Sequence, residues 1–220
     1  MVDRLLYYIS VFLALIVVLP LHEYAHAFVA YKCGDPTAKN LGRLTINPLA
    51  HFDPIGLIFF AIAGFGLAKP VPINPNNFRK YKKGCFLVSI AGVACNYVLA
   101  FLAYPLFILS MYIPKFGYFT NVLSNVLYLI FHFGLAFFVF NLLPIYPLDG
   151  FRVIDAFSKR RSKIYQFLRT KGVFVLYFLF LLSIIADAIG VWQIDVLGNF
   201  ISIVSGYLGY PITLFWGLIF

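Results

Sequence analysis

The sequence has very little charge. Only 11% of its 220 residues are Asp, Glu, Lys or Arg, whereas charged residues make up about a quarter of a typical globular domain. Hydrophobic residues account for 62% of the chain and aromatic residues for 20%. Several apolar runs reach the length of about 20 residues that a helix needs to cross a bilayer. The shortage of charge excludes an ordinary soluble domain, and the apolar runs predict an integral membrane protein.

Cysteine and histidine are also scarce, with three and four copies. An odd number of cysteines without zinc-ribbon spacing excludes a disulfide framework and a cysteine-based zinc site. Four histidines are too few for the several histidine clusters of a membrane di-iron desaturase. The net charge of +9 would suit a nucleic-acid-binding protein, but the basic residues fall in the loops between apolar segments, as the positive-inside rule predicts. We therefore expect no nucleic-acid partner.

The apolar runs and the breaks between them predict the organisation of the chain. Residues 54–68 form a short, glycine-rich run that we expect to dip into the membrane and return, or to pack partly embedded. In the turn-rich region before it, GRLTI at 42–46 alternates as a strand does. We predict an all-α integral membrane protein, a helix bundle of five to six transmembrane segments with a short membrane-associated β-hairpin region. The long segments lie at about 5–31, 85–113, 119–143, 172–192 and 196–218.

The stretch VVLPLHEYAHAFVAY places two histidines and a glutamate in an otherwise apolar helix. His22, Glu23 and His26 form an H-E-x-x-H motif, in which histidines four residues apart share one helix face and reach one Zn²⁺. Glu23 lies beside the first ligand, where a general base is needed. The alternative is a pair of buried histidines bonded to the backbone. Three ionisable groups in one turn of a membrane helix are costly without a partner, which favours the metal site.

A catalytic zinc usually has three protein ligands and one open position. Among the remaining histidines and acids, Asp149 stands out because it follows the prolines of NLLPIYPLDG at the end of an apolar segment. Non-helical backbone is tolerated at membrane depth only where it is buried in protein or lines a watery cavity. His51 and Asp53 either orient a ligand imidazole as possible second-shell partners or shape the turn before Pro54.

HEYAH followed far downstream by NLLPIYPLDG resembles the site-2 protease family of intramembrane zinc metalloproteases. GRLTINPLAHFDPIG, FGLAKPVPINPNNF and SIAGVACNYVLA are similar to the compact prokaryotic branch of that family, so that the resemblance covers roughly residues 15–155. By motif position, the resemblance implies that His22, His26 and Asp149 bind one Zn²⁺ per chain and that Glu23 is the general base.

The resemblance also implies that Asn141, eight residues before the aspartate, helps to hold the substrate carbonyl. Two positions depart from the family pattern. Phe151 stands where the family has a second glycine after the aspartate-glycine pair, and Val93 stands where it has the proline of a glycine-proline pair. Both departures bear on helix packing or substrate access, and neither removes a ligand.

The sequence therefore predicts an intramembrane zinc metalloprotease that hydrolyses a peptide bond in or near transmembrane segments of membrane protein substrates (regulated intramembrane proteolysis). The alternative, from a different class, is a catalytically inactive relative that binds membrane helices as an adaptor. The expected partners are a transmembrane protein substrate and the lipid bilayer, and the oligomeric state stays open. We expect one domain over residues 1–220, with the catalytic core at about 5–155 and C-terminal helices at about 172–218. GRLTI either pairs with an unwound substrate by β-augmentation or is an ordinary surface hairpin.

The ligand positions predict the topology. His26 and Asp149 meet on one side of the bilayer only if the chain between them crosses an even number of times. If residues 54–68 do not cross, 15 of the 17 Lys and Arg residues lie on one face, the exceptions being Arg4 and Lys115. The positive-inside rule makes that face cytoplasmic. We expect a multi-pass protein of the cell membrane with five full crossings, the N-terminus outside and the active site opening toward the cytoplasm.

Overall fold

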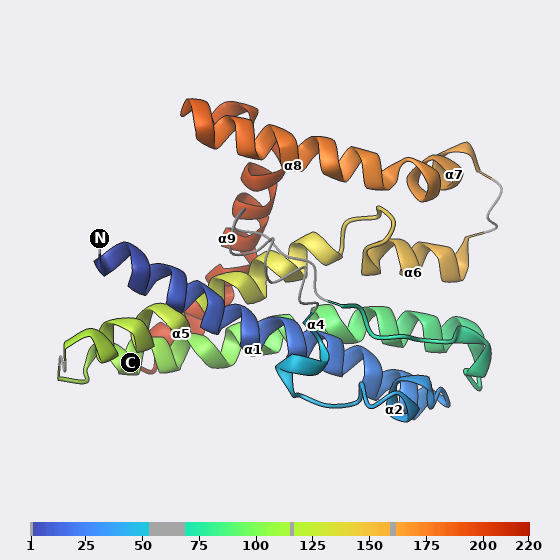
Figure 1. The fold of residues 1–220 in the computed structure, drawn as a ribbon, viewed down its shortest axis with the longest axis horizontal. Helices are drawn as coiled ribbons and strands as arrows, with labels where there is room; N and C mark the ends of the chain where they lie inside the picture. The colour runs from blue at the N-terminus through green and yellow to red at the C-terminus, as the bar shows by residue number, and fades with distance from the viewer. Residues whose placement is uncertain (1, 53–68, 115–116, 159–161) are drawn as a thin grey trace.

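The computed structural model describes residues 2–52, 69–114, 117–158 and 162–220, and its regular elements are helices (Figure 1). Single 3₁₀ turns are found at Pro48–Ala50, Pro75–Asn77 and Trp192–Ile194. The α-helices of the described residues are α1 (Val2–Cys33), α2 (Thr37–Asn40), α4 (Tyr81–Met111), α5 (Gly117–Asn141), α6 (Asp149–Phe157), α7 (Lys163–Thr170), α8 (Gly172–Ile189) and α9 (Val196–Gly217).

Five of these helices, α1, α4, α5, α8 and α9, are long and apolar enough to cross a membrane. Large apolar side chains cover much of their outer surface; Phe174 and Tyr177 on α8, for example, are 66% and 64% exposed. Such a surface is stable only in contact with lipid or a protein partner. The prediction of an all-α, multi-pass membrane protein is confirmed.

Helices α1, α4 and α5 pack against one another in alternating directions and form the main core (Figure 1). Ala14 of α1 and Ala100 of α4 are fully buried where the helices meet. Small side chains let membrane helices approach closely, which is how such helices gain packing contacts without a hydrophobic driving force. The buried members of this core are Ala14, Val18, Ala100, Ala103, Leu129, Ile130, Phe131, Leu135 and Ile212.

Helix α8 stands apart from this core, and α9 runs across the view between α8 and the core (Figure 1). The second half of α9 contacts α4, where Tyr97 Oη donates to Leu208 O (3.3 Å) and Trp216 Nε1 donates to Phe101 O (3.0 Å). In Figure 1 the C-terminus lies toward the end of the core that carries the N-terminus. A chain that crosses the membrane five times in alternating directions has its termini on opposite sides. The fifth full crossing therefore stays a prediction.

The strand expected at residues 42–46 is wrong, because these residues form a turn and a bend with no strand pairing. Gly42 adopts a positive φ of 67°, and the backbone N–H of Arg43 donates to Ala38 O at 2.8 Å, closing the end of α2. Residues with an alternating apolar pattern therefore end helix α2 here and do not form an extended strand. No β-hairpin is found within the described residues, and the expected dip at residues 54–68 lies outside them.

Candidate metal centre

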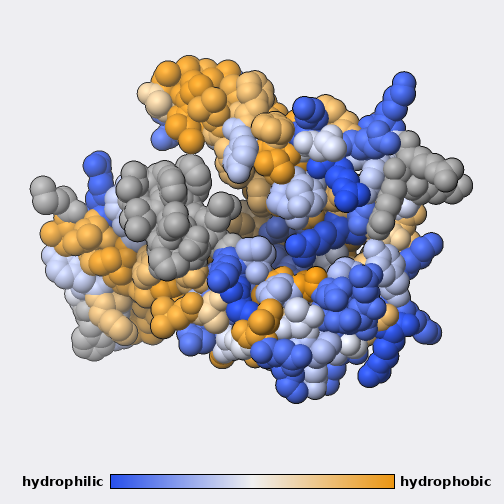
Figure 2. All heavy atoms as spheres, turned by 45° about the vertical axis from the view of Figure 1, so that its right-hand side comes forward, coloured by the Kyte–Doolittle hydropathy of each residue, from blue (hydrophilic) through white to orange (hydrophobic). Residues whose placement is uncertain are grey.

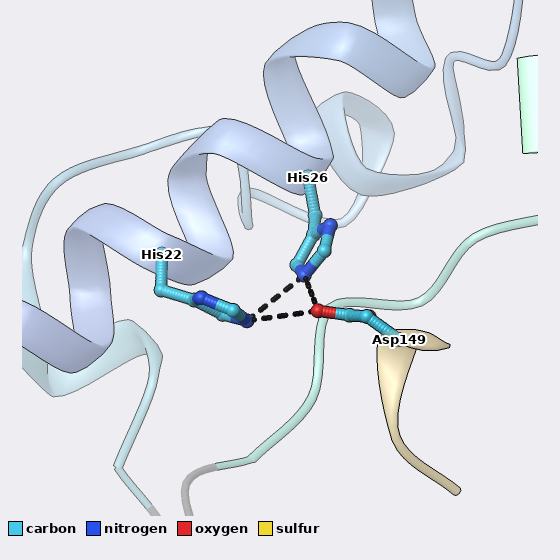
Figure 3. A group of neighbouring side chains, drawn as sticks. All are labelled: His22, His26 and Asp149. Carbon is cyan, nitrogen blue, oxygen red and sulfur yellow. Dashed lines mark hydrogen bonds and ion pairs between the residues drawn. The ribbon is translucent and has the colours of Figure 1, made fainter. Parts of the chain in front are cut away.

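Helix α1 presents His22 and His26 on one face, as their spacing predicts, and the two Nε2 atoms lie 3.0 Å apart. Asp149, the first residue of α6, comes from the other half of the chain. Its Oδ2 atom lies 3.3 Å from His22 Nε2 and 3.0 Å from His26 Nε2 (Figure 3). All three side chains are buried. The fold thus brings together the three residues in which the sequence predicts a zinc site.

The three atoms have the spacing that one zinc ion requires. Zinc–ligand bonds of about 2.0–2.1 Å in a tetrahedron place neighbouring ligand atoms roughly 3.3 Å apart, close to the distances of 3.0, 3.0 and 3.3 Å found between His22, His26 and Asp149. Among the described residues, Asp149 Oδ2 is buried without a hydrogen-bond donor of its own. A cation held between the imidazoles and this oxygen would satisfy all three groups, so the donor set fits zinc.

Helix α4 supplies partners for the other nitrogen of each imidazole. Val88 O lies 2.7 Å from His26 Nδ1, and the Asn96 amide lies 3.0 Å from His22 Nδ1. A histidine that binds a metal through Nε2 carries its proton on Nδ1, where an acceptor orients the ring. In the structure Asn96 Nδ2 faces His22 Nδ1 and Asn96 Oδ1 is buried without a partner among the described residues; half a turn of the amide would let Oδ1 accept the Nδ1 proton. Both imidazoles are therefore oriented from α4.

Two glycines allow the backbone to approach the site. A Cβ atom on Gly92 would collide with the imidazoles of both His22 and His26. A Cβ atom on Gly150 would collide with Leu142 O, at the start of the connection from α5 to α6. Helix α4 must be bare at Gly92 for the histidines to occupy their positions, and the connection must close tightly at Gly150 for Asp149 to reach them.

Asp149 is held as a carboxylate. Burial alone raises its pKa, but the imidazoles of His22 and His26 beside Oδ2 outweigh this, so that the pKa of Asp149 lies well below its usual range. Its place in the first turn of α6 also favours negative charge, because a helix N-terminus is electropositive. The Arg152 guanidinium, half exposed, lies 3.8 Å from Asp149 Oδ1. Asp149 thus presents a negatively charged carboxylate to a cation at the predicted site.

Glu23 follows His22 on α1 and is partly buried. Its Oε2 atom accepts a hydrogen bond of 2.8 Å from the backbone N–H of Val71. Val71 lies in the extended segment before α4, far from Glu23 in the sequence. The predicted base is thus restrained by a backbone donor that the sequence alone does not point to.

The other predicted site residues lie elsewhere. His51 is fully buried, and its Nε2 atom lies 2.7 Å from Thr45 O, so it stabilises its own loop rather than contacting the paired imidazoles. Asp53 lies outside the described residues. Asn141 ends α5, where its Nδ2 atom donates to Phe137 O at 3.1 Å. Its predicted role in holding substrate stays a prediction.

The two departures from the family pattern are absorbed by packing. Phe151 is 2% exposed and stacks on Tyr165 of α7, with ring centroids 5.4 Å apart. The Tyr165 hydroxyl donates to Asp155 and accepts from Arg169. Val93 is 1% exposed inside the bundle. The larger side chain at Phe151 therefore attaches α7 to α6, next to the predicted ligand Asp149.

Sequence reasoning missed three contacts near the site, which are made by Asn96, Gly92 and Val71. A signal for the first two exists: an asparagine in an apolar membrane helix needs a partner, and Gly92 lies four residues before it on the same helix face. Neither observation names His22 as that partner. For Val71 no signal exists, because its contribution comes from the backbone.

Two histidines and an adjacent glutamate on a membrane-length helix, with a carboxylate from a second, short helix, define a multi-pass membrane metallopeptidase. The model of Peptidase family M50 matches residues 10–185. The chain belongs to this family, the site-2 protease family, and its cofactor is zinc.

Curated relatives carry the same description. The "Putative zinc metalloprotease YwhC" of Bacillus subtilis (strain 168) is 44% identical over 160 residues, which cover 70% of this chain and 73% of that protein. The "Putative zinc metalloprotease Rip2" of Mycolicibacterium smegmatis is 33% identical over 170 residues, 69% of this chain and 60% of that protein. Rip2 of Mycobacterium tuberculosis (strain H37Rv) is 28% identical over 97% of this chain and 83% of its own length. No solved structure matches the chain.

Proposed function

We propose that the protein is an intramembrane protease that hydrolyses a peptide bond in or near a transmembrane segment of a membrane protein substrate, in regulated intramembrane proteolysis. The proposal rests on one observation: His22 Nε2, His26 Nε2 and Asp149 Oδ2 lie within 3.3 Å of one another. Glu23 lies on the same helix as the two histidines. We assign the first three as zinc ligands and Glu23 as the general base.

The chemistry divides between the ion and the side chains. Bound zinc supplies a Lewis acid for the scissile carbonyl and lowers the pKa of water to about 7. Glu23 accepts a proton from the water that attacks the carbonyl carbon, and delivers it to the amine nitrogen as the C–N bond breaks. Because His22 and His26 are oriented through their Nδ1 atoms, their Nε2 lone pairs stay directed at one point throughout the reaction.

The substrate must expose its peptide bond before it is cleaved. The backbone of a transmembrane helix is occupied by its own hydrogen bonds, so a cleavable segment has to unwind. Asn141 uses one amide proton on Phe137 O and keeps the other for an acceptor, since a carboxamide has two donors. We assign this second proton to a carbonyl of the unwound substrate.

The proposal includes the orientation in the cell membrane. Helices α4 and α5 supply the even number of crossings that returns Asp149 to the side of His26. Hydrophilic side chains gather over the end that carries α2, α6 and α7, whereas hydrophobic ones cover α8 (Figure 2). The charge distribution supports a site that opens toward the cytoplasm. That residues 54–68 dip into the membrane and return, or pack partly embedded, stays part of the proposal.

The test compares the detergent-purified wild type with Glu23→Gln, using Asp187→Asn, an exposed acid on α8, as the matched control. We expect about one zinc per chain in all three proteins, and cleavage of a transmembrane-helix substrate by the wild type and the control only. Zinc without cleavage by any of them would favour the adaptor function. Absence of zinc from the wild type after metal supply would contradict the proposal.

A further inference from the structure

An extended segment with two prolines lies against the base Glu23. We call residues 69–74, KPVPIN, the proline strap. It is anchored at its start, where the Lys69 N–H donates to His51 O at 2.8 Å and Arg43 Nη2 donates to Lys69 O at 2.5 Å. At its end, the Asn74 N–H donates to Asp35 Oδ2 at 2.7 Å. The strap is therefore held at both ends by other parts of the protein.

The middle of the strap offers a single backbone donor. Pro70 and Pro72 have no N–H, so the N–H of Val71 is the only one between them. It donates to Glu23 Oε2 at 2.8 Å. A residue that precedes a proline is confined to extended conformations, which restricts both Lys69 and Val71. The direction of this one donor is thus set by the covalent structure of the strap as well as by its anchors.

The anchors are buried, so they hold firmly. Asp35 is fully buried, Arg43 is 9% exposed and Val71 is 5% exposed. The Val71 side chain packs with Ala27 of α1 and Ala38 of α2. The hydrogen bond from the Val71 N–H to Glu23 is itself partly buried, and a hydrogen bond to a charged group is stronger than one between neutral groups. The strap and α1 are therefore packed as one unit around Glu23.

Glu23 needs such a restraint because of its place on the helix. Successive residues are about 100° apart around an α-helix, so Glu23 projects about 100° away from His22 and about 60° away from His26. Its side chain has three rotatable bonds, and without a partner it would sample positions away from the imidazoles. A misplacement of about 1 Å can reduce a catalytic rate by about 100-fold.

We propose that the proline strap positions the general base, and that Val71 is the positioning residue, acting through its backbone N–H on Glu23 Oε2. The proposal rests on the proposed proteolytic function for the role of Glu23. It assigns to the K-P-V-P segment a task in catalysis that its side chains do not reveal, since the contact is made by the main chain. Arg43 and Asp35 act through the strap by holding its two ends.

The contact itself is tested without any activity measurement. Because neither flanking proline has an amide hydrogen, the Val71 amide is the only exchangeable one between residues 70 and 72, and hydrogen exchange there reports this hydrogen bond alone. We expect protection of the Val71 amide in the zinc-loaded wild type to fall about tenfold or more in Glu23→Ala. Unchanged protection would overturn the proposal.

The consequence for catalysis is tested by two substitutions at one position. Val71→Pro removes the N–H and retains an apolar side chain, whereas Val71→Ala keeps the N–H and removes most of the side chain. We expect the kcat of Val71→Pro to lie about 10- to 100-fold below that of Val71→Ala, with similar KM and equal zinc content. Equal kcat values, or a higher kcat in Val71→Pro, would overturn the proposal.

Two further measurements separate folding and functional failures from failure of this proposal. If Val71→Pro loses its zinc, the α-hydroxy acid counterpart of valine at position 71 replaces the N–H by oxygen and keeps the side chain; the same loss of kcat is expected. Arg43→Met releases the start of the strap and is expected to lower kcat, with partial recovery in Arg43→Lys. A wild type that cleaves nothing refutes the proteolytic function, while the exchange experiment still decides whether the strap holds Glu23.

Discussion

The Nε2 atom of His26 lies 3.0 Å from Oδ2 of Asp149, although the whole of α4 and α5 separates these residues in the chain. Helix α4 leads away from the histidines of α1 and helix α5 leads back to them. The position of Asp149 therefore depends on how these helices pack. We therefore expect residues of α4 that do not contact the ion to affect zinc binding, as well as the predicted ligands.

Asp149→Asn is expected to remove most of the bound zinc, because a neutral amide replaces the charged oxygen that faces both imidazoles. Asp155→Asn, on the same helix and hydrogen-bonded to Tyr165 instead, is the matched control and should retain about one zinc per chain. Metal analysis of the purified proteins measures the difference. Equal zinc content in the two variants would exclude Asp149 as a ligand.

Gly92→Ala is expected to abolish zinc binding and to lower stability, because the added methyl group collides with both imidazoles. Gly206 on α9 provides the control, since a Cβ atom there meets nothing within 4 Å. Overpacking a close-packed site destabilises by about 1–3 kcal/mol. Zinc content and the midpoint of thermal unfolding should fall for Gly92→Ala and not for Gly206→Ala. A fully metallated Gly92→Ala protein would show that α4 is not packed on the histidines as described.

Asn96→Ala is expected to lower zinc affinity by about 10- to 100-fold, as removal of partners that orient metal ligands commonly does. The ring of His22 loses the group that orients it through Nδ1, while every ligand stays in place. Asn199→Ala on α9, where the side-chain amide donates to Trp192 O, remote from His22 in the sequence, is the control. Competition with a chelator of known affinity measures the change. An unaltered affinity would mean that α4 does not orient His22.

The protein is expected to lose stability in acid when the carboxylate of Asp35 becomes protonated. Burial raises its pKa, but hydrogen bonds from Thr37, Asn77 and Asn74 outweigh burial and lower the pKa below the ordinary value. Because the pKa of the folded state lies below the unfolded value of about 3.9, the carboxylate stabilises the protein above that pH. This contribution is lost as the pH falls below about 3.9 through the folded-state pKa.

Asp35→Asn is accordingly expected to be less stable than the wild type by about 1–3 kcal/mol at neutral pH, because two backbone N–H groups lose a charged acceptor. The gap in unfolding midpoint between the two proteins should narrow as the pH is lowered toward 3. A gap that stays constant over this range would mean that the charge of Asp35 does not stabilise the fold.

The sequence predicts the part of the site that is local. His22, Glu23 and His26 lie within two turns of one helix, so their spacing determines which faces they share. Asp149 could be selected only by its proline-broken setting and by resemblance to a family, since its distance from His26 depends on tertiary packing. The contact of Asn96 with His22 could not be predicted, because the pattern of α4 does not show which of its faces meets α1.

The strand predicted at residues 42–46 shows how local geometry overrides an alternating pattern. Gly42 reverses the chain after α2, and Arg43 turns its side chain to Lys69 O. Alternation describes which residues are apolar but not which backbone groups have partners. The hydrogen bond from the Val71 N–H to Glu23 could not be predicted for the same reason, since a backbone N–H is present at nearly every position.

Zinc X-ray absorption of the purified, metal-loaded protein tests the central claim most directly. Two imidazole nitrogens and carboxylate or water oxygens at about 2.0–2.2 Å are predicted, with loss of the signal in Asp149→Asn. Absence of zinc, or sulfur ligands at about 2.3 Å from Cys33, Cys85 or Cys95, would contradict a centre built from His22, His26 and Asp149.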